Sequence, residues 1–512
     1  MNEFLKSHYR KQSEPHVASV PCNSPLASVK GLRSGSKKFI HSPHSLQVDA
    51  KKLSLPPFRF YDIMKKMSNK QTSRTEKDSL GTVKIPKDAY YGTTTHRALK
   101  NFQISGLKAP QIFRESLGIV KLAAAETNTS LGLIKKNHGK ALKKACEEFI
   151  GGKFENEFVL DVFQAGAGTS YNMNANEVIA NRSNEILKAP KGSYKFIHPN
   201  NHVNMGQSTN DVIPTATRIA ILFSTPELLK AAYALEKAFE EKSKKYAKTV
   251  KVGRTHLQDA VPVTFGQTFD AYREALKKSR ELIAEASQKL QVLAIGGTAL
   301  GTGINAHPKY KSQMIKTLTR LTGIKFSSAK NLTEGINNMN DFMNFSSALK
   351  SLATDLLNIS ETFKIMATGP KAGLNEILLP PVQPGSSIMP GKVNPSIIEA
   401  LEMICIQVCG NDKCVEMASQ KSQFELNVFC PLIMHNILQS IKILTNGATM
   451  FHELCLEKIE INKEEIKKQF ENSLCTATEL VPKIGYAQTA EIVKAALKNK
   501  TTIKEELKKR KL

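Results

Sequence analysis

Long helical runs constrain the fold of this chain more than any other feature. Five stretches from residue 227 onward repeat apolar residues at three- and four-residue spacing, with few glycines or prolines. Uninterrupted helices of roughly 25 residues usually belong to helical bundles. The stretches are 227–248, 267–293, 337–367, 396–421 and 431–456. Strand signals are few, so we predict a mainly α fold with a central bundle of long helices.

Helix-breaking residues refine this prediction. A shorter helical stretch begins near Pro214, and we expect it to break at Pro226, before the first long run. The last run carries Gly447, where we expect an interruption. Shorter helical patterns cover 110–131, 140–150 and 175–187.

Changes in composition suggest domain boundaries. Residues 1–75 contain twelve serines and no sustained periodicity, which predicts a disordered basic extension. We then expect a mixed, mostly helical N-terminal domain over 76–207 and the long-helix bundle over 208–460. Short, lysine-rich segments in 461–512 predict a small C-terminal helical domain.

The distribution of charge bears on the choice of partner. The formal net charge is +26, and residues 1–75 and 494–512 together contribute 16 of it. No RNA-binding aromatic motif or zinc-finger spacing accompanies these basic ends, so we expect no nucleic-acid partner. The mild excess over the rest of the chain suits an acidic small-molecule substrate.

Apolar runs and cysteines bear on the compartment. No apolar run approaches the eighteen or so residues that cross a bilayer, so we expect no membrane association. The eight cysteines form neither a disulfide framework nor a metal-binding spacing, which favours a reducing, cytoplasmic location. The N-terminal extension leaves mitochondrial targeting open as an alternative.

The segment Gly385-Ser-Ser-Ile-Met-Pro-Gly-Lys-Val-Asn-Pro395 carries the strongest chemical signal. Its serines, glycines and prolines predict a loop. Backbone N–H groups of such a loop can hold an anion, and Lys392 adds a positive charge near Ser386 and Asn394. The pattern indicates a loop that binds an anion and moves a proton. The alternative is an ordinary surface loop that contains Ser and Lys.

Three other polar strings accompany this loop. Gly166–Asn174 presents Thr169 just before a helix, where backbone N–H groups can bind a carboxylate. His202–Asp211 contains Ser208, Thr209 and Asn210, for which helix capping is the alternative, above all for Asp211. Gly253–Pro262 contains Thr255 and His256, and a lone histidine is often purely structural. Glu399, early in the helix after the serine loop, could pair with His256.

The loop resembles the Ser-Ser-x-Met-Pro-x-Lys-x-Asn signature of the fumarase/aspartase superfamily, and all four strings match its characteristic blocks in order and spacing. The resemblance runs from about Arg74 to Lys504. It implies a three-domain fold around a long-helix bundle, and a homotetramer whose active sites combine blocks from different subunits. It also implies elimination that releases fumarate, and a divalent cation such as magnesium as an activator, for which we can name no ligands. The sequence contains no nucleotide loop, haem motif or zinc spacing, so we expect no organic cofactor.

The resemblance assigns roles to individual residues. Ser386 is the expected general base, made basic by Lys392 and the loop amides. His256 and Lys392 are the other expected catalytic residues. Glu399 is expected to pair with His256 without touching the substrate itself. The expected substrate-binding residues are Thr169, Ser208, Thr209, Asn210, Thr255, Ser387 and Asn394.

The choice of substrate rests on a few positions. Fumarases typically read Gly-Ser-Gly-Thr and Ser-Ser-Asn-Asp in the first two blocks, whereas this chain has Ala167 and Thr209, the aspartase pattern. Ser170 and Ala260-Val261 agree with aspartase. We therefore expect an aspartate ammonia-lyase that converts L-aspartate to fumarate and ammonia.

Other functions remain as alternatives. The segments 424–429 and 435–436 look more like fumarase, which makes fumarate hydratase the alternative enzyme. Argininosuccinate and adenylosuccinate lyases share the serine loop but usually diverge in the first two blocks. A scaffold protein with an inactive lyase fold is a different class, and the presence of Ser386, Lys392 and Thr169 argues against it.

Overall fold

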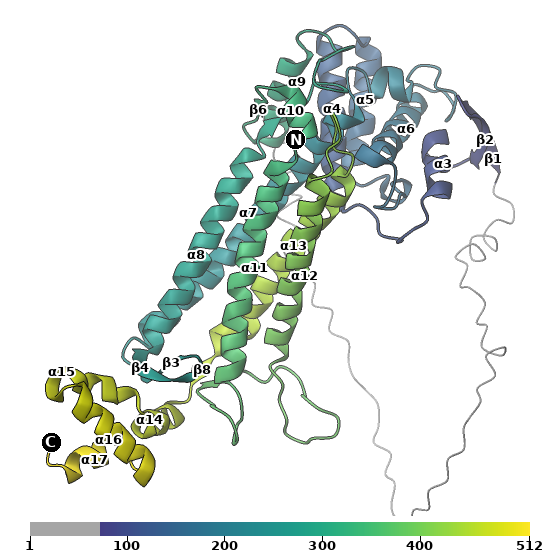
Figure 1. The fold of residues 1–512 in the computed structure, drawn as a ribbon. Coiled ribbons are helices and arrows are strands. Elements are labelled where there is room, and N and C mark those ends of the chain that lie inside the picture. The colour runs from purple at the N-terminus through teal and green to yellow at the C-terminus, as the bar shows by residue number, and fades with distance from the viewer. Residues whose placement is uncertain (1–71) are drawn as a thin grey trace, which may run out of the picture. The chain divides into compact units, whose positions relative to one another are not determined.

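The computed structural model describes residues 72–512 (Figure 1). The extension predicted at 1–75 therefore lies almost entirely outside the described residues. The five long helices are the most prominent feature of the described part, which confirms the mainly α fold with a central bundle. They are α7 (Thr209–Lys245), α8 (Phe265–Lys289), α11 (Asn340–Met366), α12 (Ser396–Ser419) and α13 (Cys430–Leu454).

These helices pack as neighbours that run alternately up and down the bundle. Helix α7 lies against α8 and α13, and α11 lies against α8 and α12 (Figure 1). We call the end where α7, α11 and α13 finish the hairpin end, and the end where α7 and α13 begin the helix-start end. The buried Lys242, near the end of α7, donates to the carbonyl oxygens of Glu457 and Ile459, just after α13. This contact fixes the two helices at the hairpin end.

The predicted break at Pro226 is wrong, because α7 continues without interruption through both Pro214 and Pro226. A proline removes one backbone hydrogen bond, yet α7 is buried against α4, α8 and α13 along much of its length. The hydroxyls of Ser224 and Thr225 also bond to the carbonyls one turn earlier. Tertiary packing outweighs the local cost at these prolines.

The predicted interruption at Gly447 is also wrong, since α13 is continuous there. A Cβ atom at this position would lie 2.8 Å from Cδ1 of Ile404 on α12. Gly447 therefore allows α12 and α13 to approach closely rather than breaking α13.

The helices before α7 pack against the helix-start end of the bundle through α4 and α6. They are α3 (Thr93–Asn101), α4 (Gln111–Ser130), α5 (Lys136–Ile150) and α6 (Thr169–Ile186), with short turns at Glu155–Glu157, Gly166–Gly168 and Pro199–Val203. Helices α9 (Tyr310–Thr322) and α10 (Leu332–Asn337) lie between α8 and α11 in the sequence. One hydrophobic core runs continuously from the N-terminal helices into the bundle.

Four two-stranded sheets complete the described fold. They are β1 (Ser73–Asp78) with β2 (Gly81–Pro86), β3 (Val250–Thr255) with β4 (Gln258–Thr264), β5 (Val292–Leu293) with β6 (Ser327–Ser328), and β7 (Ile377–Leu378) with β8 (Glu460–Ile461). The β5–β6 pair is parallel, whereas β3–β4 and β7–β8 are antiparallel.

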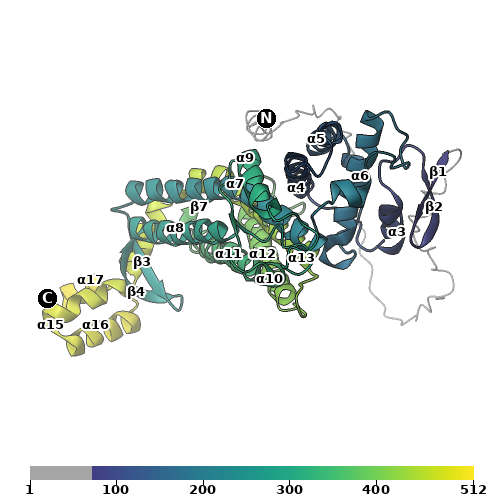
Figure 2. The ribbon, with the colours of Figure 1, turned by 90° about the horizontal axis from the view of Figure 1, so that it is seen from above.

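The C-terminal helices lie beside the β3–β4 hairpin (Figure 2). They are α14 (Lys463–Asn472), α15 (Val481–Ile484), α16 (Tyr486–Asn499) and α17 (Ile503–Lys509), with short turns at Leu456–Lys458 and Cys475–Leu480. They have a small hydrophobic core of their own, centred on Ile492. The domain boundaries at 207/208 and 460/461 stay predictions. None of the helices between residues 72 and 512 has the length and apolar composition needed to cross a bilayer.

Candidate functional site

Two helix N-termini meet at the helix-start end and bring two of the predicted blocks together. Thr169 is the first residue of α6, and Thr209 is the first residue of α7. Asn172, in the first turn of α6, donates Nδ2 to Oγ1 of Thr209 across 3.1 Å. Helix N-termini carry partial positive charge and unpaired N–H groups. This arrangement is suited to a carboxylate.

The second block forms the N-terminal cap of α7. Ser208 and Asp211 form a capping box at the start of α7, with Asp211 Oδ1 accepting from the Ser208 N–H at 3.0 Å. The other oxygen of Asp211 accepts from the N–H groups of Gly296 and Thr298, each at 3.0 Å. Asp211 is therefore a buried structural group, as the capping alternative predicts. Burial raises the pKa of its carboxyl to about 7.

The hydrogen bonds of Ser208 and Asn210 leave part of each side chain free to bind a ligand. Ser208 Oγ accepts from the Asn210 N–H at 3.2 Å, so its hydroxyl hydrogen remains available as a donor. Asn210 donates its amide to the carbonyl oxygen of Ala299 at 2.9 Å.

A buried lysine lies behind Thr209, and the sequence did not predict it as a site residue. Lys121, on α4, is 1% exposed, and its Nζ donates to Oδ1 of Asn172, Oδ1 of Asn204 and Oε1 of Gln207 at 2.6, 3.1 and 3.0 Å. Burial lowers its pKa to about 7, and the nearby Asp211 carboxylate opposes that shift. The available signal was a single lysine inside the apolar run 117–125. A lysine in an apolar helical stretch becomes buried, so its amino group needs hydrogen-bond partners from other parts of the fold.

The serine loop lies between β7 and α12 and closes on itself. The Gly385 N–H donates to the Lys392 carbonyl at 2.9 Å, and Asn394 Nδ2 donates to the Gly385 carbonyl at 2.8 Å. A Cβ atom at position 385 would lie 2.4 Å from the Lys392 oxygen, so this closure requires glycine. Ser387 and Lys392 are exposed on the surface of the loop.

Ser386 itself is held by two backbone donors. The N–H groups of Ile388 and Met389 donate to its Oγ at 3.2 and 3.1 Å. Hydrogen bonds to an oxygen that becomes negatively charged favour the charged form. The loop therefore provides part of the environment that a basic serine oxygen needs.

The third block forms the tip of the β3–β4 hairpin. Thr255 pairs with Gln258, and the two turn residues His256 and Leu257 have φ of 55° and 62°. Positive φ at both positions is typical of the tight turns that match strand twist. Thr255 and His256 are exposed. Arg254, next to them, forms an ion pair of 2.6 Å with the buried Glu376, in the segment that leads to the serine loop.

One chain does not bring all four blocks together. The Ala167 N–H bonds to the carbonyl of Val428 at 2.7 Å, just before α13 begins, whereas Asn394 lines a small hollow with Leu454 and Cys455 where α13 ends. The 25 residues of α13 rise roughly 37 Å between these points. Thr169, Ser208, Thr209 and Asn210 thus lie at the helix-start end, while Thr255, His256, Ser386, Ser387, Lys392 and Asn394 lie at the hairpin end (Figure 1).

The expected pair of Glu399 and His256 is not formed within the chain. Glu399 lies in the first turn of α12, and His256 lies at the hairpin tip. Among the ion pairs between residues 72 and 512, none joins these two side chains.

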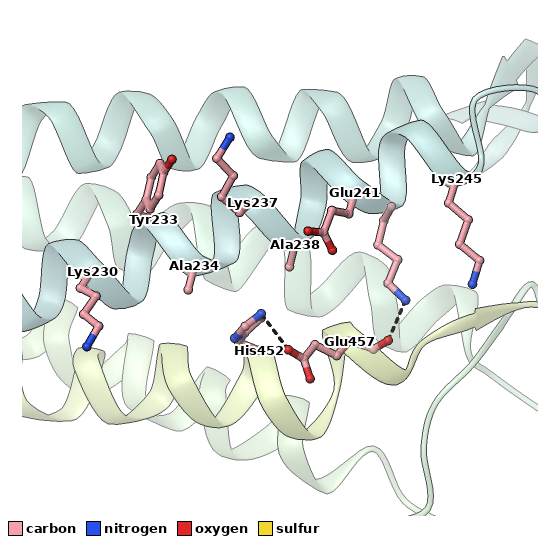
Figure 3. A pocket seen from close by; sticks show the side chains of 10 residues that line it. Lys230, Tyr233, Ala234, Lys237, Ala238, Glu241, Lys245, His452 and Glu457 are labelled. Carbon is pink, nitrogen blue, oxygen red and sulfur yellow. Dashed lines mark hydrogen bonds and ion pairs between the residues drawn. The ribbon is translucent and has the colours of Figure 1, made fainter. Parts of the chain in front are cut away.

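A groove of about 630 Å³ lies between α7 and α13 (Figure 3). Lysines from α7 line it, but several are already engaged in contacts. Lys242 donates to two backbone carbonyls, Lys237 pairs with Glu240, and His452 lies 3.3 Å from Glu457. The groove holds none of the predicted site residues.

The structure gives no set of ligands, among the residues that it describes, for the magnesium ion that the resemblance implies. Between residues 72 and 512, no group of three or more His, Cys, Asp or Glu side chains is placed to hold a metal ion. We therefore assign no chemical step to magnesium.

Comparison with known proteins identifies the family. The model of a lyase family matches residues 81–410. An aspartate ammonia-lyase from a Bacillus species is 45% identical over 84% of this chain and 92% of its own length. The chain belongs to the fumarase/aspartase family of lyases. This confirms the resemblance seen in the four blocks.

Other relatives show that the family includes enzymes of two activities, and that this chain is almost equally similar to both. A class II fumarate hydratase from Bacillus subtilis is 44% identical over 84% of this chain and 94% of its own length. A solved fumarate lyase/delta crystallin from Brucella melitensis, bound to cobalt, is 45% identical, with a TM-score of 0.83. A class II fumarase from Schistosoma mansoni is 36% identical, with a TM-score of 0.84. Each structural match covers 86% of this chain and 96% of the other.

Proposed function

We propose that this lyase is an aspartate ammonia-lyase, which eliminates ammonia from L-aspartate to give fumarate. The observation that supports this choice is the combination of Ala167 and Thr209 at the helix-start end. Both belong to the aspartase pattern; Ala167 lies in the short turn just before α6, and Thr209 is the first residue of α7. Ala167 supplies no hydroxyl where fumarases typically have serine, so this site offers a different set of hydrogen bonds to its ligand.

One carboxylate of the substrate binds at the helix-start end. The N-termini of α6 and α7 point their partial positive charge to the same place, and Thr169, Ser208 and Thr209 add hydroxyl donors. The buried Lys121 lies behind them and adds positive charge when it is protonated. Negative charge on a substrate carboxylate, and the extra charge of an aci-carboxylate, is favoured there.

The serine loop supplies the proton acceptor and the remaining positive charge. Ser386, as an oxyanion held by two N–H groups, takes the proton from the carbon next to the side-chain carboxylate. The electron pair moves into that carboxylate to form the aci-carboxylate, and then forms the carbon–carbon double bond as ammonia leaves the neighbouring carbon. Lys392 and Asn394 stabilise the carboxylate charge, while Thr255, His256 and Asn210 bind the rest of the substrate.

A complete site needs more than one copy of the chain, because one chain separates its blocks by roughly the length of α13. We propose a homotetramer in which the helix-start end of one copy meets the hairpin ends of others. Helix α12 presents a suitable contact surface. Met403, Ile406 and Met417 are 70%, 61% and 56% exposed and share one face with Gly410, at heptad spacing. An exposed row of apolar side chains on a helix usually packs against another helix.

Fumarate hydratase is the second candidate, and specific observations favour it. The segments 424–429 and 435–436 resemble fumarases, and the fumarate hydratase relative is almost as similar as the aspartate ammonia-lyase. The same loop and helix starts could release water from malate in place of ammonia.

One assay decides between the two reactions. Purified protein is given L-aspartate or L-malate separately, and fumarate is followed by its ultraviolet absorbance. We expect fumarate from aspartate, with an equal amount of ammonia, and little from malate. Turnover of malate without turnover of aspartate would reject the proposal in favour of hydratase. The Ser386→Ala protein is the control for contaminating host lyases.

A further inference from the structure

Lys121, Asn172 and Thr209 form a chain of hydrogen bonds that ends at the proposed carboxylate site. Lys121 donates to Asn172 Oδ1 at 2.6 Å, and Asn172 donates to Thr209 Oγ1 at 3.1 Å. Lys121 and Asn172 are each 1% exposed, whereas Thr209 is half-buried at the surface of the site. The first two residues are therefore sealed from solvent behind the third.

The orientation of the Asn172 amide is determined by its partners. When Lys121 is protonated, its three hydrogens go to Asn172, Asn204 and Gln207, so the oxygen of Asn172 faces the lysine. The amide nitrogen then faces away and donates to Oδ1 of Asn204 and to Thr209. Rotation of the amide would place its NH₂ group against the ammonium, which is unfavourable in a buried setting.

The hydrogen bond from Asn172 also determines whether the Thr209 hydroxyl donates or accepts toward a ligand. Its oxygen accepts from Asn172, and among the contacts of residues 72–512 its hydrogen is donated to no protein group. A hydroxyl has one hydrogen and two lone pairs. With one lone pair occupied from behind, the hydrogen remains available to a ligand on the exposed side.

We propose that Lys121 and Asn172 are positioning residues that fix the Thr209 hydroxyl as a donor to a substrate carboxylate. The proposal deepens the proposed function, since it rests on Thr209 facing the substrate. It does not depend on which group is eliminated, because L-aspartate and L-malate share the two carboxylates. Neither Lys121 nor Asn172 contacts the substrate in this scheme.

The test is a double-mutant cycle on the binding of succinate, a dicarboxylate that cannot react. Asn172→Asp keeps the size of the side chain and can pair with Lys121, but its carboxylate accepts the Thr209 hydrogen. We expect succinate affinity, measured by calorimetry on the assembled protein, to fall about 10- to 100-fold. Thr209→Val, which lacks the hydroxyl, should lose a similar amount. The double variant should be no weaker than Thr209→Val, because the two changes remove the same donated hydrogen.

Control variants separate this role from general damage to the fold. Thr215→Val removes a hydroxyl that is buried deeper in α7 and bonds only to the Asp211 carbonyl, so it should bind succinate normally. If Asn172→Asp does not fold, Asn172→Ser leaves the Thr209 hydroxyl without its buried donor. Its expected loss is about three- to tenfold, and that loss should disappear in the Thr209→Val background.

Two results would overturn the proposal: unchanged succinate affinity in a folded Asn172 variant, or losses that multiply in the double variant. Failure of the proposed function gives a different result. A hydratase would still show the cycle with succinate while releasing no ammonia from aspartate.

Discussion

Thr209 and Ser386 lie at opposite ends of the same helical bundle within one chain. Thr209 begins α7 at the helix-start end, and Ser386 lies in the loop before α12 at the hairpin end. Both residues belong to blocks of one proposed active site. The site that we propose is therefore completed by another copy of the chain.

This separation predicts complementation between inactive variants. Asn210→Ala disables the helix-start end, and Ser386→Ala disables the serine loop. Each variant alone should have very low activity. When the two are unfolded together and reassembled in equal amounts, about one quarter of the sites should receive both intact residues, and activity should recover to about that fraction.

The control for complementation uses two changes in the same loop. Ser386→Ala mixed with Lys392→Ala should recover no activity, because each site takes both residues from one copy. Recovery in this control, or none in the first mixture, would contradict the composite site.

The two neighbouring serines of the loop should behave differently. Ser386 receives two backbone N–H groups, whereas Ser387 is exposed. We expect Ser386→Ala to reduce kcat by about 100- to 10,000-fold, as loss of a general base does. Ser387→Ala should mainly raise KM. Steady-state kinetics with thermal melting as a check on folding decide this, and equal effects of the two changes would argue against Ser386 as the base.

The exposed face of α12 should be essential for assembly. Ile406→Asp places a charge in the middle of the apolar row, where burial against another helix would be costly. We expect the protein to remain helical by circular dichroism but to dissociate, as shown by light scattering, and to lose activity. Tyr486→Asp, at a residue that is 79% exposed on α16, is the control and should leave assembly intact. An assembled, active Ile406→Asp protein would show that this face is free.

The ion pair between Glu148 and Arg182 should make the N-terminal helices sensitive to acid. Arg182 donates to both oxygens of Glu148, at 2.6 and 2.9 Å, and lowers the carboxyl pKa from 4.5 to about 2. Because the folded pKa lies below the unfolded value, the pair stabilises the fold above pH 4.5 and loses this effect as the pH falls towards 2. Glu148→Gln should therefore cost about 1 to 2 kcal/mol at pH 7.

Denaturant unfolding at several pH values measures this effect. The difference between Glu148→Gln and the unchanged protein should shrink as the pH approaches 2. Glu240→Gln is a useful comparison, since Glu240 also pairs with lysines but lies at the surface, where solvent weakens the contribution. A pH-independent cost for Glu148→Gln would indicate packing rather than charge.

Local pattern was sufficient to predict the long helices and the loop that carries Ser386. Apolar spacing identifies a helix because it depends on the chain's own periodicity. The roles proposed for the Gly, Ser and Lys of the loop rest on their own backbone and side chains, so they could be proposed from the sequence. The same local reasoning failed at Pro226 and Gly447, because contacts with other helices decide the outcome there.

Only the tertiary structure showed how the site is divided and what supports it. Sequence order says nothing about distance across a bundle, so the separation of Thr209 from Ser386 appears only when α7 and α13 are in place. Lys121 acquires its three acceptors from segments that lie 51 to 86 residues further along the chain. The sequence by itself determined which side chains are available for the proposed chemistry, since that follows from side-chain type and local spacing. The fold decided which of them meet, since long-range packing alone sets the distances between them.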